Sequence, residues 1–223
     1  MTPVLEAEAL VLDRVDAGEH HVRLTLLTPA PGLVVAMFRP ARGGKSGARA
    51  KGQTAGSARP DVFDHAAVLL HSPKAGAAHG SVYFIQEYKV LQRHAGLARS
   101  YEALEAAAGL AKLIMRNSVH FESCQEVFKL CRQALGALEA GAPPEVVRFK
   151  ALFLLARAEG YPAREQWLPT LAAEDRELAQ SLLRRPVAET VDLPAESLAR
   201  VSRLRVGCER WLAEHTDLEL GRK

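Results

Sequence analysis

The chain has 223 residues, of which 48% are hydrophobic and 25% charged, and its 29 basic and 26 acidic side chains give a net charge of only +3. This composition excludes a disordered or collagen-like chain. The longest uninterrupted apolar runs, 33–38 and 151–156, have about six residues, far below the roughly 18 that a membrane span needs. The first eight residues include two acids and no base, the reverse of a secretory signal, so a cytoplasmic protein without a membrane partner is expected.

Up to about residue 91, hydrophobic positions recur with a period of two, which is typical of β-strands. Gly and Pro occupy the connections between these segments, as tight turns require. Five strands in about 90 residues favour a small closed barrel over an open sandwich, because closure removes exposed strand edges. The predicted strands are 8–15, 21–28, 33–39, 62–71 and 81–91.

From Leu97 onward the apolar spacing changes to three and four residues, which indicates α-helices. Helix ends are marked by Gly followed by Pro, as at Gly160 and Pro162. The sequence therefore predicts an α+β protein with a barrel domain over 1–91 and an all-α bundle over 92–223. In the first helix the positions expected to face the core are Leu97, Tyr101, Leu104, Ala108, Ala111 and Met115; later helices are predicted over 121–140, 143–159, 173–184 and 194–214.

No motif for catalysis or metal binding emerges. The three cysteines, Cys124, Cys131 and Cys208, form no close pairs. Cys124 and Cys131, seven residues apart on one helix face, are interpreted as small core thiols. The tripeptide 44–46, Gly-Lys-Ser, resembles the end of a P-loop, but that motif needs a glycine at the position of Arg39 and a helix directly after it. Neither an enzyme activity nor a cofactor or metal is expected.

The sharpest local feature is the segment 39–60, which contains six basic residues and no acid within a protein of net charge +3. Its glycines and small polar residues oppose a packed core, so the cations stay solvated and can replace the counterions of a phosphate backbone. A flexible, soluble connection without a partner is the alternative. The candidate nucleic-acid-binding residues are Arg39, Arg42, Lys45, Arg49, Lys51 and Arg59.

A second cationic group lies on the last predicted helix, where Arg200, Arg203 and Arg210 are spaced to share one face. These residues are candidates for a second nucleic-acid contact. Because three glutamates share the helix, a solvated polar face is the alternative.

Aromatic residues of the barrel half are candidates for base stacking. At strand period most of them belong to the core, so at most one or two are expected to be exposed. Tyr83 and Phe84 are neighbours and point to opposite faces, so one of the two is the best candidate. The full set is Phe38, Phe63, Tyr83, Phe84 and Tyr88.

Several short motifs follow one another in a characteristic order. In the strand half they are Gly18-Glu19 before the second strand, Leu24 to Pro29 and Gly32 before the third strand, and Ala41-Arg42-Gly43-Gly44-Lys45-Ser46 after the third strand. In the helical half they are Arg148-Phe149-Lys150, in a helix that ends at Gly160-Tyr161-Pro162, and the final helix over 205–220. Together with the barrel-then-bundle order, they resemble the RecO family of bacterial recombination mediators.

The resemblance implies an N-terminal OB-fold and a non-catalytic, nucleoid-associated DNA repair protein. Such a protein binds single- and double-stranded DNA, anneals strands, and helps to load RecA together with RecR while contacting the acidic tail of the single-stranded-DNA-binding protein. Many members bind zinc through two Cys pairs after the Gly-Tyr segment, but 163–169 contains no cysteine here, so no zinc is expected. The competing hypothesis is a protein-interaction adaptor whose bundle holds a partner peptide and whose barrel has little DNA affinity.

Overall fold

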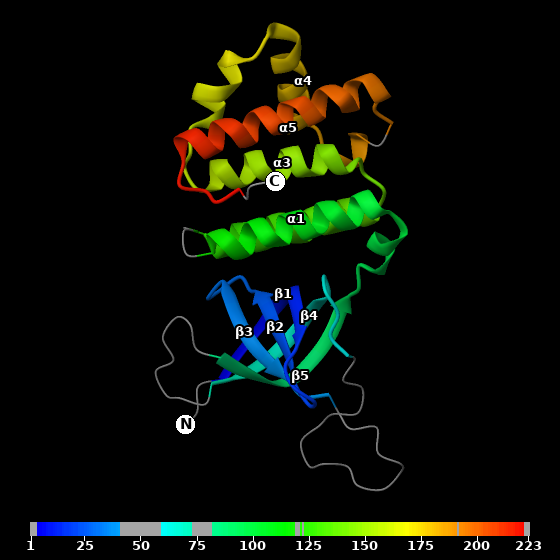
Figure 1. Ribbon diagram of the computed structural model, residues 1–223, viewed down its shortest axis with the longest axis vertical. Coiled ribbons are helices and arrows are strands. Elements are labelled where there is room, and N and C mark those ends of the chain that lie inside the picture. The colour runs from blue at the N-terminus through cyan, green and yellow to red at the C-terminus, as the bar shows by residue number, and fades with distance from the viewer. Residues whose placement is uncertain are drawn as a thin grey trace, which may run out of the picture. The chain divides into compact units, whose positions relative to one another are not determined.

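The computed structural model describes residues 4–40, 59–72, 82–118, 121, 123–190 and 192–220. The protein is α+β, as predicted, with a five-stranded sheet followed by helices (Figure 1). It divides into two compact units, 1–93 and 94–223, so the division falls two residues after the expected one. No helix among the described residues combines the length and the apolarity that a membrane crossing requires.

The strands of the first unit pair in the order β1-β2-β3-β5-β4, and β4 pairs with β1 to close a barrel. All pairs are antiparallel except β3 with β5, which run parallel over three residue pairs. Each strand overlaps its predicted range, although β1 starts four residues earlier and β4 three residues later than expected. The bounds are β1 Val4–Asp16, β2 Val22–Leu27, β3 Leu33–Phe38, β4 His65–His71 and β5 Val82–Gln92.

The barrel core is formed by alternate residues of every strand. On β2 and β3, for example, Val22, Leu24, Ala36 and Phe38 point inward and are buried, whereas Arg23 between them is exposed. The period-two pattern of the sequence thus places alternate side chains inside and outside the barrel. The buried core residues are Ala9, Val11, Val22, Leu24, Leu26, Val34, Ala36, Phe38, Ala66, Val68, Leu70 and Tyr88.

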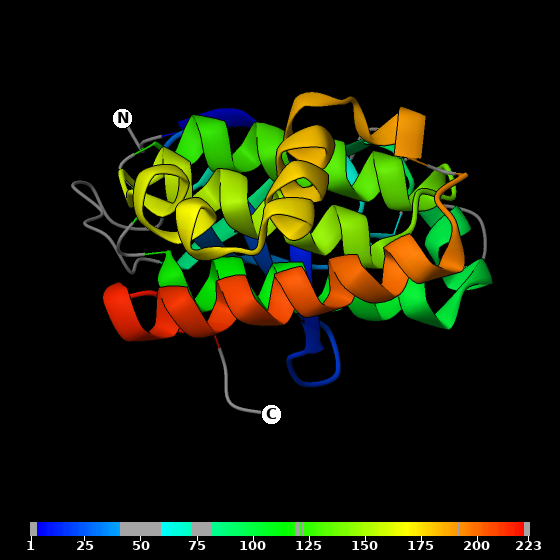
Figure 2. The same ribbon diagram turned by 90° about the horizontal axis from the view of Figure 1, so that it is seen from above.

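The second unit is a helical bundle around α3. This helix contacts α1, α2 and α5, lies between α1 and α5 in Figure 1, and is buried on nearly all sides, as expected for a helix that is apolar all round. Viewed from above, α4 is nearest to the viewer and α5 runs along one side (Figure 2). The bounds are α1 Tyr101–Asn117, α2 Cys124–Glu139, α3 Pro144–Ala158, α4 Ala173–Arg184 and α5 Ala195–His215, with short helical turns η1 Ala95–Arg99, η2 Ala163–Trp167, η3 Leu168–Thr170 and η4 Val187–Thr190.

The predicted core face of α1 is only partly right: Leu97 and Ala111 are buried, but other positions are not. Tyr101 is 76% exposed and Leu104 is 41% exposed, because the helix packs through its small residues instead. Alanines let two helix backbones approach closely, and their short side chains contributed too little to the apolar pattern to reveal this face. The buried positions are Ala103, Ala106, Ala107, Leu110, Ala111, Ile114 and Asn117.

Candidate nucleic-acid interface

The basic segment 39–59 leaves the barrel at the end of β3 and returns to it before β4. Arg39 follows Phe38 directly and is exposed, and Arg59 is exposed beside the buried Pro60. Neither arginine forms an ion pair with another described residue. The predicted contacts Arg42, Lys45, Arg49 and Lys51 lie outside the described residues.

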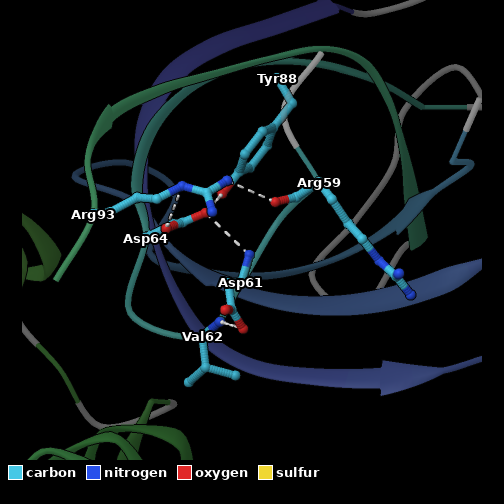
Figure 3. A network of polar contacts seen from close by, with 6 residues as sticks. All are labelled: Arg59, Asp61, Val62, Asp64, Tyr88 and Arg93. Carbon is cyan, nitrogen blue, oxygen red and sulfur yellow. Dashed lines mark hydrogen bonds and ion pairs between the residues drawn. The ribbon is translucent and has the colours of Figure 1, made fainter. Parts of the chain in front are cut away.

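The C-terminal end of the basic segment, at Arg59, lies close to the buried carboxylate of Asp64, which immediately precedes β4 (Figure 3). The Tyr88 hydroxyl donates to Asp64 Oδ2 at 3.1 Å, and the backbone N–H of Asp61 donates to the same oxygen at 3.0 Å. Arg93 Nε lies 3.7 Å from Asp64 Oδ1. Burial, followed by the charge of Asp64, raises the pKa of Tyr88 far above its usual 10, so this hydroxyl remains a donor at all ordinary pH values.

Arg93 extends this network to the basic segment itself. Its Nη2 donates to the backbone carbonyl of Arg59 at 2.9 Å, so the network holds the Arg59 backbone and leaves the side chain free. In Figure 3 the Arg59 guanidinium extends away from the Asp64 cluster. The last cation of the segment is therefore presented from a fixed backbone position.

The turn between Arg59 and β4 is also pinned to β1. Phe63 has a φ of 69°, a left-handed conformation that costs a bulky residue about 1–2 kcal/mol. Its N–H donates to the Val11 carbonyl at 2.7 Å, and the Val11 N–H donates to the Asp64 carbonyl at 3.0 Å. Because the Phe63 ring is buried, the packing of that ring offsets the backbone strain.

Of the five aromatic candidates, Phe84 is the exposed one. Phe38, Phe63 and Tyr88 are buried, and Tyr83 packs partly against the barrel core. Phe84 on β5 is 44% exposed. The expectation that one of the neighbours Tyr83 and Phe84 faces outward is therefore confirmed.

The arginines of α5 have three different environments. Arg200 donates twice to Asp175 Oδ1, at 2.9 and 3.0 Å, and lies 3.3 Å from Glu174, so its charge is largely neutralised. The hydrogen bond to Asp175 raises the pKa of Arg200. Arg203 and Arg210 are exposed and form no ion pair with another described residue.

Arg205 is not among the predicted contacts, although it is held by two ion pairs. It is buried, with Nε donating to Glu145 at 2.8 Å and Nη1 donating to Glu209 at 2.7 Å. Burial by itself would lower the pKa of Arg205, but the two glutamates raise it above its ordinary value. An i,i+4 spacing from Arg205 to Glu209 was the only local signal of this cluster.

An open cavity of about 740 Å³ lies beside Arg205 and is lined by α1, α3 and α5, with Leu138 of α2 and Leu220 after α5. Its wall combines apolar residues such as Leu110, Ala151 and Leu152 with five cations, of which Arg148 and Arg205 are paired with Glu145 or Glu209. The excess of positive charge therefore comes from the other three cations, which face the acid Glu105. The sequence did not predict this cavity, since the residues come from helices far apart in the chain. The lining cations are Lys112, Arg116, Arg148, Arg205 and Arg210.

Two of the three cysteines lie in the core, and Cys124 is only partly buried. Cys131 and Cys208 are buried, and burial raises the pKa of each thiol to about 12, which makes them inert core residues. Within the described part of the chain, no three His, Cys, Asp or Glu residues form a metal-binding group.

Comparison with known proteins gives no assignment: no protein-family model matches this chain, and no curated protein matches it.

Proposed function

We propose that this protein is a non-catalytic DNA-binding mediator of repair and recombination, similar to the RecO proteins, and that its barrel is an OB-fold. Support for the fold comes from the closed five-stranded order β1-β2-β3-β5-β4, since an OB-fold is a five-stranded Greek-key barrel that binds oligonucleotides on its β2–β3 face and neighbouring loops.

The observation on which the proposal rests is the basic segment 39–59 emerging from the barrel wall. It has six cations and no acid, and the exposed Arg39 and Arg59 at its two ends have no ion-pair partner among the described residues. The barrel unit has 11 basic and 8 acidic residues, whereas the helical unit has 18 of each, so the entire net charge of +3 belongs to the barrel. Cations without acidic partners are those that bind phosphates.

Contacts of this kind explain the proposed activity without any bond-making step. Phosphate contacts do not depend on base sequence, so both single- and double-stranded DNA bind. Two strands neutralised by the same segment repel each other less and anneal. To help load RecA, the protein, acting with RecR, then needs only to deliver the bound DNA strand to RecA.

The proposal is tested by fluorescence anisotropy of a labelled 30-nucleotide single strand at low and moderate salt. Changing Arg42, Lys45 and Arg49 together to Ala is expected to weaken binding by at least several-fold and to reduce its salt dependence by up to three phosphate contacts. A matched control removes the same charge from exposed positions of the helical unit: Lys129, Arg157 and Arg164 changed to Ala. Equal affinities for the two triple variants would contradict the role of the segment.

A second candidate function, a protein-interaction adaptor, is favoured by the cavity of the helical unit. An apolar wall surrounded by excess cations suits a short acidic peptide with apolar side chains, such as the tail of the single-stranded-DNA-binding protein. Both functions can coexist, because the cavity residues belong to the helical unit and the basic segment belongs to the barrel.

The adaptor function is tested with a fluorescent acidic peptide ending in that tail. Changing Arg116 and Arg210 to Ala removes two lining cations and is expected to weaken peptide binding several-fold. The matched control is Arg203→Ala, which removes an exposed cation of the same helix that does not line the cavity. Peptide binding without any DNA affinity would favour the adaptor as the sole function.

A further inference from the structure

A cation and an exposed aromatic ring share one cross-strand row on the outer face of the barrel. Arg23 of β2 lies opposite Met37 of β3, and Met37 lies opposite Phe84 of β5. The residues before and after Arg23 point into the core, so this row is on the outside. Because neighbouring strands are about 4.8 Å apart, Arg23 and Phe84 are separated by two strand spacings, roughly 10 Å.

Phe84 is part of a small apolar surface. Val82 lies two residues earlier on β5, on the same face, and is also exposed, while the half-buried Met37 lies beside Phe84. A single exposed apolar side chain needs no explanation, but an aromatic ring within an apolar surface, with a cation two strands away in the same row, resembles a stacking site. The other barrel aromatics are used in the core, which leaves Phe84 available for a ligand.

Two cations without a described ion-pair partner lie at this row. Arg23 is the only charged residue of β2 and β3, and it forms no ion pair with another described residue. Arg39 follows the end of β3, two residues after Met37, and is exposed. The outward acids Glu6 and Glu8 lie on the part of β1 that pairs with β4, whereas Asp13 lies opposite Thr25 on the same face as Arg23, and Glu87 of β5 is exposed. Neither Asp13 nor Glu87 forms an ion pair with Arg23 or Arg39, so these two guanidinium groups remain available to an anionic ligand with flat, apolar groups.

We infer that the outer face of β2, β3 and β5 is a stacking site for single-stranded nucleic acid, in which Phe84 stacks on a base and Arg23 and Arg39 bind flanking phosphates. The inference rests on the proposed function and adds to it a preference for single-stranded over double-stranded nucleic acid. A base within a duplex is already stacked on both faces, so Phe84 contributes to the binding of single strands and not of duplexes. The basic segment then binds either form, and this row distinguishes them.

The test compares an oligo-dT single strand containing one 2-aminopurine with a duplex of equal length. Phe84→Ala is expected to weaken single-strand binding by roughly ten-fold, the loss of one stacked base, and to change duplex binding by less than about two-fold. Fluorescence quenching of 2-aminopurine on binding is expected to disappear in Phe84→Ala and to persist in Phe84→Trp. Tyr101→Ala, which removes an exposed ring from the helical unit, is the matched control and should leave both affinities unchanged.

The outcomes distinguish loss of the stacking site from absence of nucleic-acid binding. Wild-type protein that binds no nucleic acid would overturn the proposed function. Wild-type protein that binds, with Phe84→Ala losing equal affinity for both forms or none for either, would overturn the stacking site alone. Circular dichroism of Phe84→Ala establishes that the barrel remains folded, so a general loss of structure is recognised as such.

Discussion

The best-held arginines of the helical unit differ from the solvated arginines on the outside of the barrel unit, although each unit has arginines of both kinds, such as the paired Arg93 and the unpaired Arg203. In the helical unit, Arg200 and Arg205 are held by carboxylates of other helices and contribute to packing. In the barrel unit, Arg23, Arg39 and Arg59 have no acidic partner among the described residues and stay exposed. A guanidinium that is partly removed from water needs a nearby carboxylate, whereas a guanidinium that binds phosphate must have no carboxylate partner. The number of arginines therefore says less about function than their partners do.

The largest expected effect concerns the Arg205 cluster. Arg205→Met removes the common partner of Glu145 and Glu209 and leaves two partly buried carboxylates side by side. A loss of about 2–3 kcal/mol in the free energy of unfolding is expected, measured by urea denaturation. Arg203→Ala, at an exposed position of the same helix, should change it by less than about 0.5 kcal/mol. Similar effects of both changes would remove the contrast between paired and solvated arginines.

A smaller effect is expected at the barrel network. Tyr88→Phe removes the hydroxyl that donates to buried Asp64 and should destabilise the protein by about 1–2 kcal/mol, because the carboxylate loses a donor without access to water. Tyr83→Phe is the matched control, since no hydrogen bond of its hydroxyl is present within the described residues. Thermal unfolding followed by circular dichroism compares the two. An unchanged melting temperature for Tyr88→Phe would show that the Tyr88 hydroxyl does not stabilise the Asp64 cluster.

The smallest expected effect is a dependence on pH that belongs to the helical unit. Burial by itself would raise the pKa of Glu145, but hydrogen bonds and charge from Arg205 hold it below its usual 4.5. This interaction is therefore fully present above about pH 4.5 and is lost as the pH falls through the lower folded value. Urea denaturation of wild type and Glu145→Gln across this range should show a smaller decrease for the variant. Parallel curves would assign the acid sensitivity to other groups.

Local patterns were sufficient for much of the fold. The change in hydrophobic spacing near residue 91 located the division between strands and helices to within two residues, and α4 was predicted with the bounds that it has. Positions of Gly and Pro fixed the turns. These features depend on residues close together in sequence, so one chain contains the information for them.

The candidate site was predictable only in part, because its decisive contacts join distant residues. Asp64 and Tyr88 are 24 positions apart, and Arg205 and Glu145 are 60 apart. Nothing in the spacing of Arg200, Arg203 and Arg210 indicated that the first is held by Asp175 while the other two are free of described ion pairs. The cavity of the helical unit combines four helices and has no signature in any one of them.

The sequence by itself determined where strands give way to helices, where the basic segment lies, and that Tyr83 and Phe84 face opposite ways. Only the tertiary structure decided that Phe84 is the exposed one, that α1 packs through its alanines, and which arginines are neutralised. The reason is physical: period and turn chemistry act between neighbours in the chain, whereas burial and ion pairing depend on which surfaces the folded chain brings together.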